Sequence, residues 1–154
     1  MDTEALLALL KDSIFLVAVF GAFLFYAMVK GRYAIINIIF ALYLALLISV
    51  EFPYYSTMSS GAVAKIGVFA AFVIAGAILF RRHIPGDDFE AAFQGLGKKI
   101  ILAALASILV MIFSFHAFPA AEIINTGTPI QSLFAPQENF FWWLILPLIF
   151  LFFL

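Results

Sequence analysis

The ionisable side chains that could do chemistry within the apolar part of this sequence are few and lie far apart. Glu51 ends one apolar segment and Lys65 lies near the start of the next. If these two segments form a hairpin, the carboxylate and the ammonium group lie at a similar depth. They could form a structural ion pair, snorkel separately to the surface, or take part in transport or catalysis. Of these alternatives we expect the ion pair.

Metal binding and nucleophilic catalysis find little support among the other residues. His116 and Glu122 could join Glu51 around a metal ion, but the three belong to different segments and have no ligand spacing. The chain has no cysteine, and it contains no GxSxG, HExxH, phosphate-binding-loop or paired-aspartate motif. We therefore expect no catalytic, metal-binding or cofactor-binding residues, and no enzymatic activity.

The composition of the chain indicates that its solvent is mostly lipid. Of its 154 residues, 66% are hydrophobic and 11% are charged, and the mean hydropathy is +1.18. A soluble domain is about half apolar and about a quarter charged. The net charge of −1 gives no attraction to a polyanion. These values exclude a soluble enzyme and a nucleic-acid-binding protein, and they make membrane lipid the first partner.

Five apolar segments predict an all-α fold, a polytopic membrane helical bundle that forms a single domain over residues 1–154. A helix needs roughly 20 residues, and at least about 17, to cross the hydrocarbon core. Four segments meet this requirement, and the fifth, which contains Pro147, either spans by thinning the bilayer or inserts partly. We expect it to span. The expected spans are about 13–29, 33–52, 62–80, 100–118 and 140–154.

The basic residues predict the orientation of the bundle. Six of the eight lysines and arginines fall on one side of the expected spans, which the positive-inside rule makes cytoplasmic. We therefore expect the protein in the inner membrane of the cell. Connections 30–32 and 81–99 then face the cytoplasm, and the N-terminus lies outside. Gly31 allows the tight first turn, because glycine tolerates a positive φ. These six cations can determine the topology alone, or they can also contact lipid headgroups or a partner. They are Lys30, Arg32, Arg81, Arg82, Lys98 and Lys99.

The longer cytoplasmic connection predicts a short helix at the membrane surface. Phe89, Phe93 and Leu96 recur at i, i+4 and i+7, which places them on one face of a helix over about 88–96. Basic residues flank this helix, as is typical of helices that lie on the inner leaflet. It can be a connector that rests on the membrane, which we expect, or a docking site for a cytoplasmic partner.

Small residues repeat every four positions on two of the expected helices. Gly67, Ala71 and Ala75 form one row, and Ala18 and Ala22 form another. Such rows let helix backbones approach closely. They can join protomers or hold this bundle together, and we expect the internal role. Two further anchors, Trp142 and Trp143, are expected at the level of the outer headgroups.

The layout resembles the colicin V production protein family of small bacterial inner-membrane proteins. The Lys30-Gly31-Arg32 turn is similar to the turn that ends the first helix in that family, and the segment from Asp88 to Lys99, with its glycines, is similar to the one before the fourth helix. The resemblance covers the first four helices. It implies an accessory protein of the cell envelope without an established reaction.

These observations lead to two hypotheses about function. The first is a non-catalytic membrane protein that acts as an accessory or scaffold subunit, with other membrane proteins or a second copy of itself as partners. The alternative is a small transporter or channel subunit that works as an oligomer. A transporter is expected to carry polar residues through the full depth of a helix, and no helix of this sequence shows such a stripe.

Overall fold

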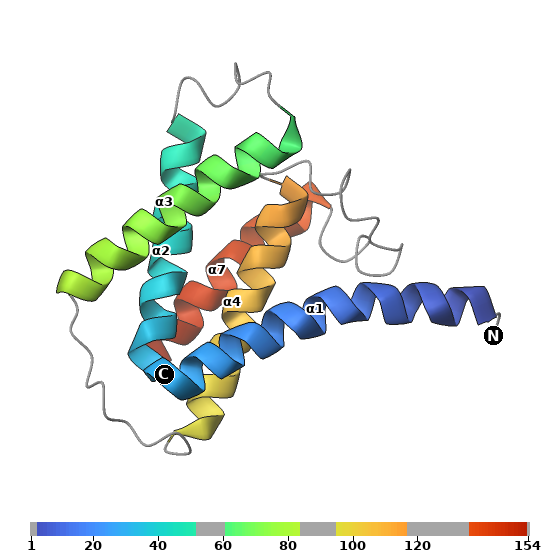
Figure 1. Cartoon of the computed structure of the whole chain (residues 1–154), viewed down its shortest axis with the longest axis horizontal. Helices are drawn as coiled ribbons and strands as arrows, with labels where there is room; N and C mark the ends of the chain where they lie inside the picture. Colours follow the sequence, from blue (N-terminus) through green and yellow to red (C-terminus); the bar gives the residue numbers. More distant parts are fainter. Residues whose placement is uncertain (1–2, 52–60, 84–94, 117–135, 154) are drawn as a thin grey trace.

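The structure, a computed structural model, describes residues 3–51, 61–83, 95–116 and 136–153, and it confirms the all-α bundle. Every secondary-structure element within these ranges is a helix, as lipid requires of a spanning backbone that must satisfy its own hydrogen bonds. Figure 1 shows the five helices, which are α1 (Thr3–Lys30), α2 (Arg32–Glu51), α3 (Ala62–His83), α4 (Leu96–His116) and α7 (Gln137–Phe153).

Two glycines with left-handed backbone conformations set helix boundaries on the cationic side. Gly31 has a φ of 84° and separates α1 from α2, as the sequence predicts. Its N–H donates to the carbonyl of Ala27 at 2.9 Å, which closes the last turn of α1. Gly95 has a φ of 68° and precedes α4, where the N–H of Lys99 donates to its carbonyl at 3.1 Å. A residue with a side chain would be strained at either position.

Four helices are long and apolar enough to cross a membrane, and they coincide with the four expected spans. The helices extend beyond the apolar windows, since α1 begins at Thr3 rather than near residue 13 and α4 begins at Leu96 rather than near residue 100. The fifth helix, α7, has 17 residues. At 1.5 Å per residue it reaches about 25 Å, short of the hydrocarbon core of about 30 Å, so its full crossing stays a prediction.

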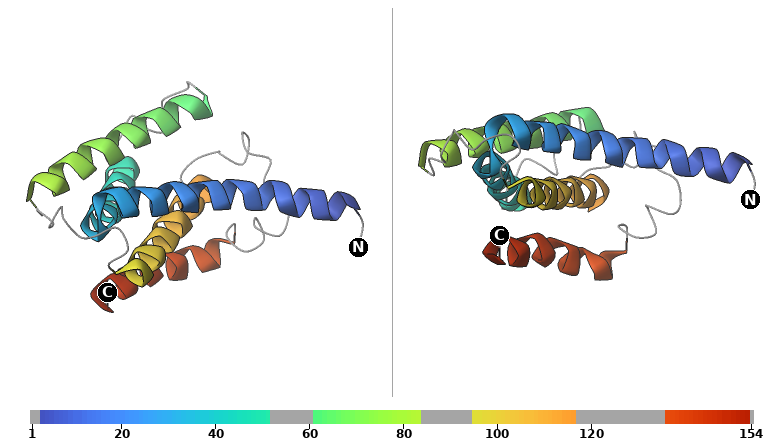
Figure 2. Two further views of the ribbon diagram at one scale, coloured as in Figure 1. Left: turned by 60° about the horizontal axis from the view of Figure 1, so that its bottom comes forward. Right: turned by 90° about the horizontal axis from the view of Figure 1, so that it is seen from below.

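The helices form three layers with α4 at the centre. In Figure 2, α2 and α4 make the middle layer, α1 and α3 lie on one side of it, and α7 lies on the other. α4 contacts α1, α2 and α7, whereas α3 packs chiefly on α2. More than half of the span in α4 is buried, against 6% of the span in α1 and 11% of that in α3. The outer layer therefore offers wide apolar faces to its surroundings, and the first half of α1 projects away from the bundle (Figure 1).

A close helix contact joins α2 and α3 through small residues. A Cβ atom built on Gly76 would lie 3.2 Å from the Cβ and 3.3 Å from the Cα of Ala41. The rings of Phe40 and Phe80 meet in the same pair of helices, with centroids 5.9 Å apart. On the neighbouring side, Phe69 of α3 reaches α4, where its ring meets the ring of Phe113 edge-on at 5.9 Å. These contacts fix α3 on the middle layer.

Candidate functional site

Glu51 and Lys65 are not brought together. Glu51 is exposed in the last turn of α2, and Lys65 is half-buried in the first turn of α3. No ion pair joins these two described residues, so the expected pair is not formed. Because Glu51 has open surroundings and the lysine has a long apolar stem, each charge can reach the interface on its own.

The polar side chains in the middle of the bundle are mostly used within their own helices. The hydroxyl of Ser107 donates to the carbonyl of Ala103 at 2.7 Å, and that of Ser114 donates to the carbonyl of Val110 at 2.7 Å. Such bonds satisfy a hydroxyl inside an apolar environment without a partner helix. The two serines therefore make no continuous polar path along α4.

Tyr43 makes a hydrogen bond between helices at mid-depth. Its hydroxyl lies in the middle of α2 and donates to the backbone carbonyl of Leu144 in α7. Pro147 has no N–H and cannot donate to the carbonyl of Trp143, next to the one that Tyr43 reaches. Side chains of neighbouring helices commonly satisfy backbone groups near prolines in membranes. This bond attaches α7 to the far side of the middle layer.

Asn37 is a buried polar residue whose side-chain oxygen accepts no hydrogen bond from the described residues. It lies in the second turn of α2 and is 5% exposed. Its Oδ1 atom has no hydrogen-bond partner among the described residues. A buried, unpaired amide oxygen is costly, and the sequence, in which Asn37 lies near the cytoplasmic end of its segment, gives no warning of it.

The structure provides no metal centre within the ranges it describes. No three histidine or acidic residues there lie close enough to share an ion. Glu122 falls outside these ranges, and the side chain of His116 is likewise not described. The interfacial helix expected over 88–96 falls almost wholly within residues 84–94, which are also outside the described ranges, and Leu96 instead begins α4.

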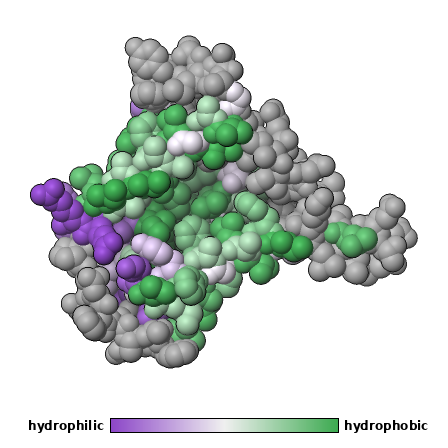
Figure 3. Space-filling model, viewed as in Figure 1, coloured by the Kyte–Doolittle hydropathy of each residue, from purple (hydrophilic) through white to green (hydrophobic). Residues whose placement is uncertain are grey.

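Cations gather at one end of the molecule. Figure 3 shows hydrophilic surface where α3 ends and where α1 meets α2, while most of the other coloured surface in this view is apolar. The guanidinium of Arg32 lies 4.8 Å from the centroid of the Tyr33 ring and donates to the Tyr33 hydroxyl at 3.1 Å. Lys99 is fully buried within the chain, so its ammonium group is not part of this exposed cationic surface. The remaining four cations are exposed: Lys30, Arg81, Arg82 and Lys98.

The row of small residues on α3 faces away from the rest of the chain. Gly67, Ala71 and Ala75 are all exposed, and a Cβ atom on Gly67 would meet nothing within 4 Å. The internal role expected for this row is filled instead by Gly76, which lies on the opposite side of α3 against α2. The row on α1, Ala18 and Ala22, is exposed as well. Both rows are thus available to another helix.

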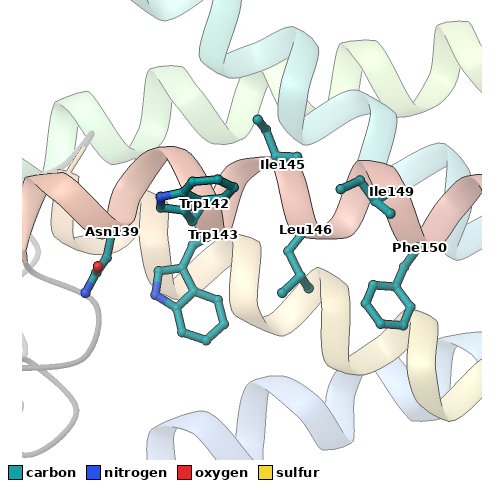
Figure 4. Close-up of a pocket in the computed structure, with 7 residues that line it drawn as sticks. All are labelled: Asn139, Trp142, Trp143, Ile145, Leu146, Ile149 and Phe150. Carbon is teal, nitrogen blue, oxygen red and sulfur yellow. The ribbon is translucent and has the colours of Figure 1, made fainter.

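A groove runs along α7, and the sequence did not predict it. It has a volume of about 540 Å³ and is lined by residues that Figure 4 labels along one side of the helix, which are Asn139, Trp142, Trp143, Ile145, Leu146, Ile149 and Phe150. The tryptophans were expected only as interfacial anchors. The sequence signal for the groove is the recurrence of large side chains at steps of three and four residues, which places them on one face of the helix. In a helix that is apolar all round, this spacing does not distinguish a groove from ordinary lipid-facing surface.

Comparisons of the chain with protein families, with curated proteins and with solved structures gave no match. The resemblance to the colicin V production proteins therefore stays a prediction.

Proposed function

We propose that this chain is a non-catalytic membrane protein that acts as an accessory or scaffold subunit of a cell-envelope assembly, with other membrane proteins or a second copy as partners. The observation that supports this most is the exposed small-residue row on α3. In lipid, helices associate through close packing of small residues, because there is no hydrophobic driving force between them. A row that no part of the described chain covers is suited to a partner helix.

The distribution of polar groups supports the same proposal. The serines of α4 bond to their own helix, and Tyr43 bonds to α7. The described helices thus present no chain of polar groups through the membrane, which a transporter or channel subunit needs. We further propose that the cationic end faces the cytoplasm in an inner membrane, in line with the positive-inside rule.

The test is a mass measurement of the protein extracted with its surrounding lipid and without detergent. We expect a complex of fixed stoichiometry whose partner is identified by mass spectrometry. Ala71→Leu and Gly67→Leu should abolish the complex, because a large side chain holds the partner backbone away. Ala70→Leu is the matched control, since Ala70 is exposed on the same helix but lies outside the row.

Two outcomes would overturn the proposal. One is a monodisperse single chain in the lipid-extracted material. The other is conduction of ions or solutes by the reconstituted protein that is lost in Glu51→Ala, which would favour the oligomeric transporter or channel subunit. Equal loss of the complex in Ala70→Leu and Ala71→Leu would move the contact away from the row.

A further inference from the structure

We propose that the groove along α7 is a binding site for one acyl chain of a membrane phospholipid, with the headgroup end of the lipid at Asn139. The proposal starts from the size of the groove, about 540 Å³, which lies within the range of about 300–1,000 Å³ found for ligand sites. It is independent of the assembly proposed above, because it involves α7 and not the row on α3.

The length of the groove suits a single extended hydrocarbon chain. From Asn139 to Phe150 the lining residues extend for about 16 Å along the helix axis. An unbranched acyl chain can lie along a groove of this length with its axis parallel to the helix.

The polarity of the groove matches an amphiphile from end to end. Asn139 lies at one end, and Figure 4 shows the indole nitrogens of Trp142 and Trp143 on the side of Asn139. An indole N–H and an amide N–H donate hydrogen bonds, which suits the ester and phosphate oxygens of a lipid. At the other end, the described lining residues are Ile149 and Phe150, which suit the methyl end of the chain.

The position of α7 places this polarity in the correct direction. α7 begins beside the end of α4 and runs back toward the cationic end of the molecule (Figure 1). In the orientation proposed above, on which this step rests, Asn139 lies at the level of the outer headgroups and Phe150 lies deeper in the bilayer. Indole rings favour this interfacial level.

The chain provides its own reporter, because its two tryptophans both line the groove. The wild-type protein in detergent micelles is titrated with a phosphatidylcholine brominated in the middle of one chain, which quenches indole fluorescence at short range. We expect quenching that reaches a plateau at a single lipid per chain. Added unbrominated phosphatidylcholine should reverse it, and doubling the detergent concentration should leave the plateau unchanged.

A second protein reports non-specific lipid contact. In this variant both tryptophans are replaced by phenylalanine and Phe25→Trp places the reporter on the exposed face of α1, where Phe25 is 71% exposed. Its quenching should follow the ratio of lipid to detergent and should not saturate. If the wild-type protein follows this same ratio, its tryptophans sense only bulk lipid and the proposal is overturned.

Variants of the groove locate the site. Leu146→Phe fills the groove and should remove the saturable quenching, whereas Leu148→Phe, on the same helix but outside the lining, should keep it. Asn139→Leu should weaken binding about fivefold, which corresponds to one net hydrogen bond of about 1 kcal/mol. Unchanged binding in Leu146→Phe would overturn the site. If Leu146→Phe loses its helical circular dichroism, the wild-type and Phe25→Trp comparison decides alone.

Discussion

Replacing Gly76 by leucine is expected to force α2 and α3 apart. A Cβ atom at this position already lies 3.2 Å from the Cβ of Ala41 and 3.5 Å from the Cδ2 of Leu44. The three further carbons of leucine have no space unless the helices move. Overpacking of this kind costs about 1–3 kcal/mol, and it falls on the helix pair through which α3 chiefly packs.

Gly67→Leu is the matched control for this substitution. Gly67 lies in the same helix, but nothing lies within 4 Å of its Cβ position. Both substitutions raise helix propensity by the same amount, up to about 1 kcal/mol, so their difference isolates the packing cost. We therefore expect Gly76→Leu to be less stable than Gly67→Leu by about 1–3 kcal/mol.

The assay is unfolding by sodium dodecyl sulfate in mixed micelles, followed by far-ultraviolet circular dichroism. The free energies of unfolding of the wild-type protein and of both variants are compared under one detergent condition, where the protein is not assembled. Equal stability of the two variants, within about 0.5 kcal/mol, would refute the close approach at Gly76. A larger loss in Gly67→Leu would place the internal contact on the row that we find exposed.

Three further predictions use single substitutions. Tyr43→Phe should lower the free energy of unfolding by about 0.6 kcal/mol, and at most about 1.7 kcal/mol, because it removes the bond to the carbonyl of Leu144; no change in the unfolding titration would argue against that bond. Glu51→Gln should leave the same titration unchanged, since Glu51 is exposed and unpaired within the described ranges, and a clear loss would indicate an ion pair. In the cysteine-free chain, Gly61→Cys should react with an impermeant maleimide outside intact cells and Arg82→Cys only after lysis; labelling of both from one side would refute the orientation.

The sequence predicts the helices of this protein better than it predicts their faces. The four spans follow from length and hydropathy, and the turn at Gly31 follows from the tolerance of glycine for a positive φ. The ends of α1 and α4 differ from the apolar windows, because a helix continues through polar residues as long as its backbone bonds are satisfied. Hydropathy predicts which residues can lie in lipid, but it does not predict where a helix begins or ends.

The two glycines of α3 show why the faces could not be predicted. Gly67 and Gly76 are both embedded in small and apolar residues, yet one is exposed and the other packs on Ala41. In a soluble protein an apolar stripe marks the buried face of a helix. In a membrane, lipid and neighbouring helices are equally apolar, so hydropathy has no contrast between them. Only the contacts in the structure show that Gly76 packs inside the bundle and that Gly67 is exposed.

Asn37 provides the sharpest test of whether chemistry takes place inside the bundle. If its Oδ1 atom has no partner in the working protein, as among the described residues, Asn37→Leu removes a buried, unpaired polar group. Such a group costs about 1–3 kcal/mol, so the substitution should leave the free energy of unfolding equal or raise it. Asn37→Asp is the counterpart, since it adds a charge at a site that is 5% exposed, and it should destabilise the chain.

The opposite result would change the interpretation of the protein. If Asn37→Leu destabilised the chain extracted with its lipid but not the chain in detergent, a ligand or partner removed by detergent would bind to that oxygen. A bundle in which Ser107, Ser114 and Tyr43 donate to backbone carbonyls would then contain a polar binding site after all. A neutral or stabilising result in both environments is what a scaffold requires, because a scaffold needs its polar groups only to hold its helices together.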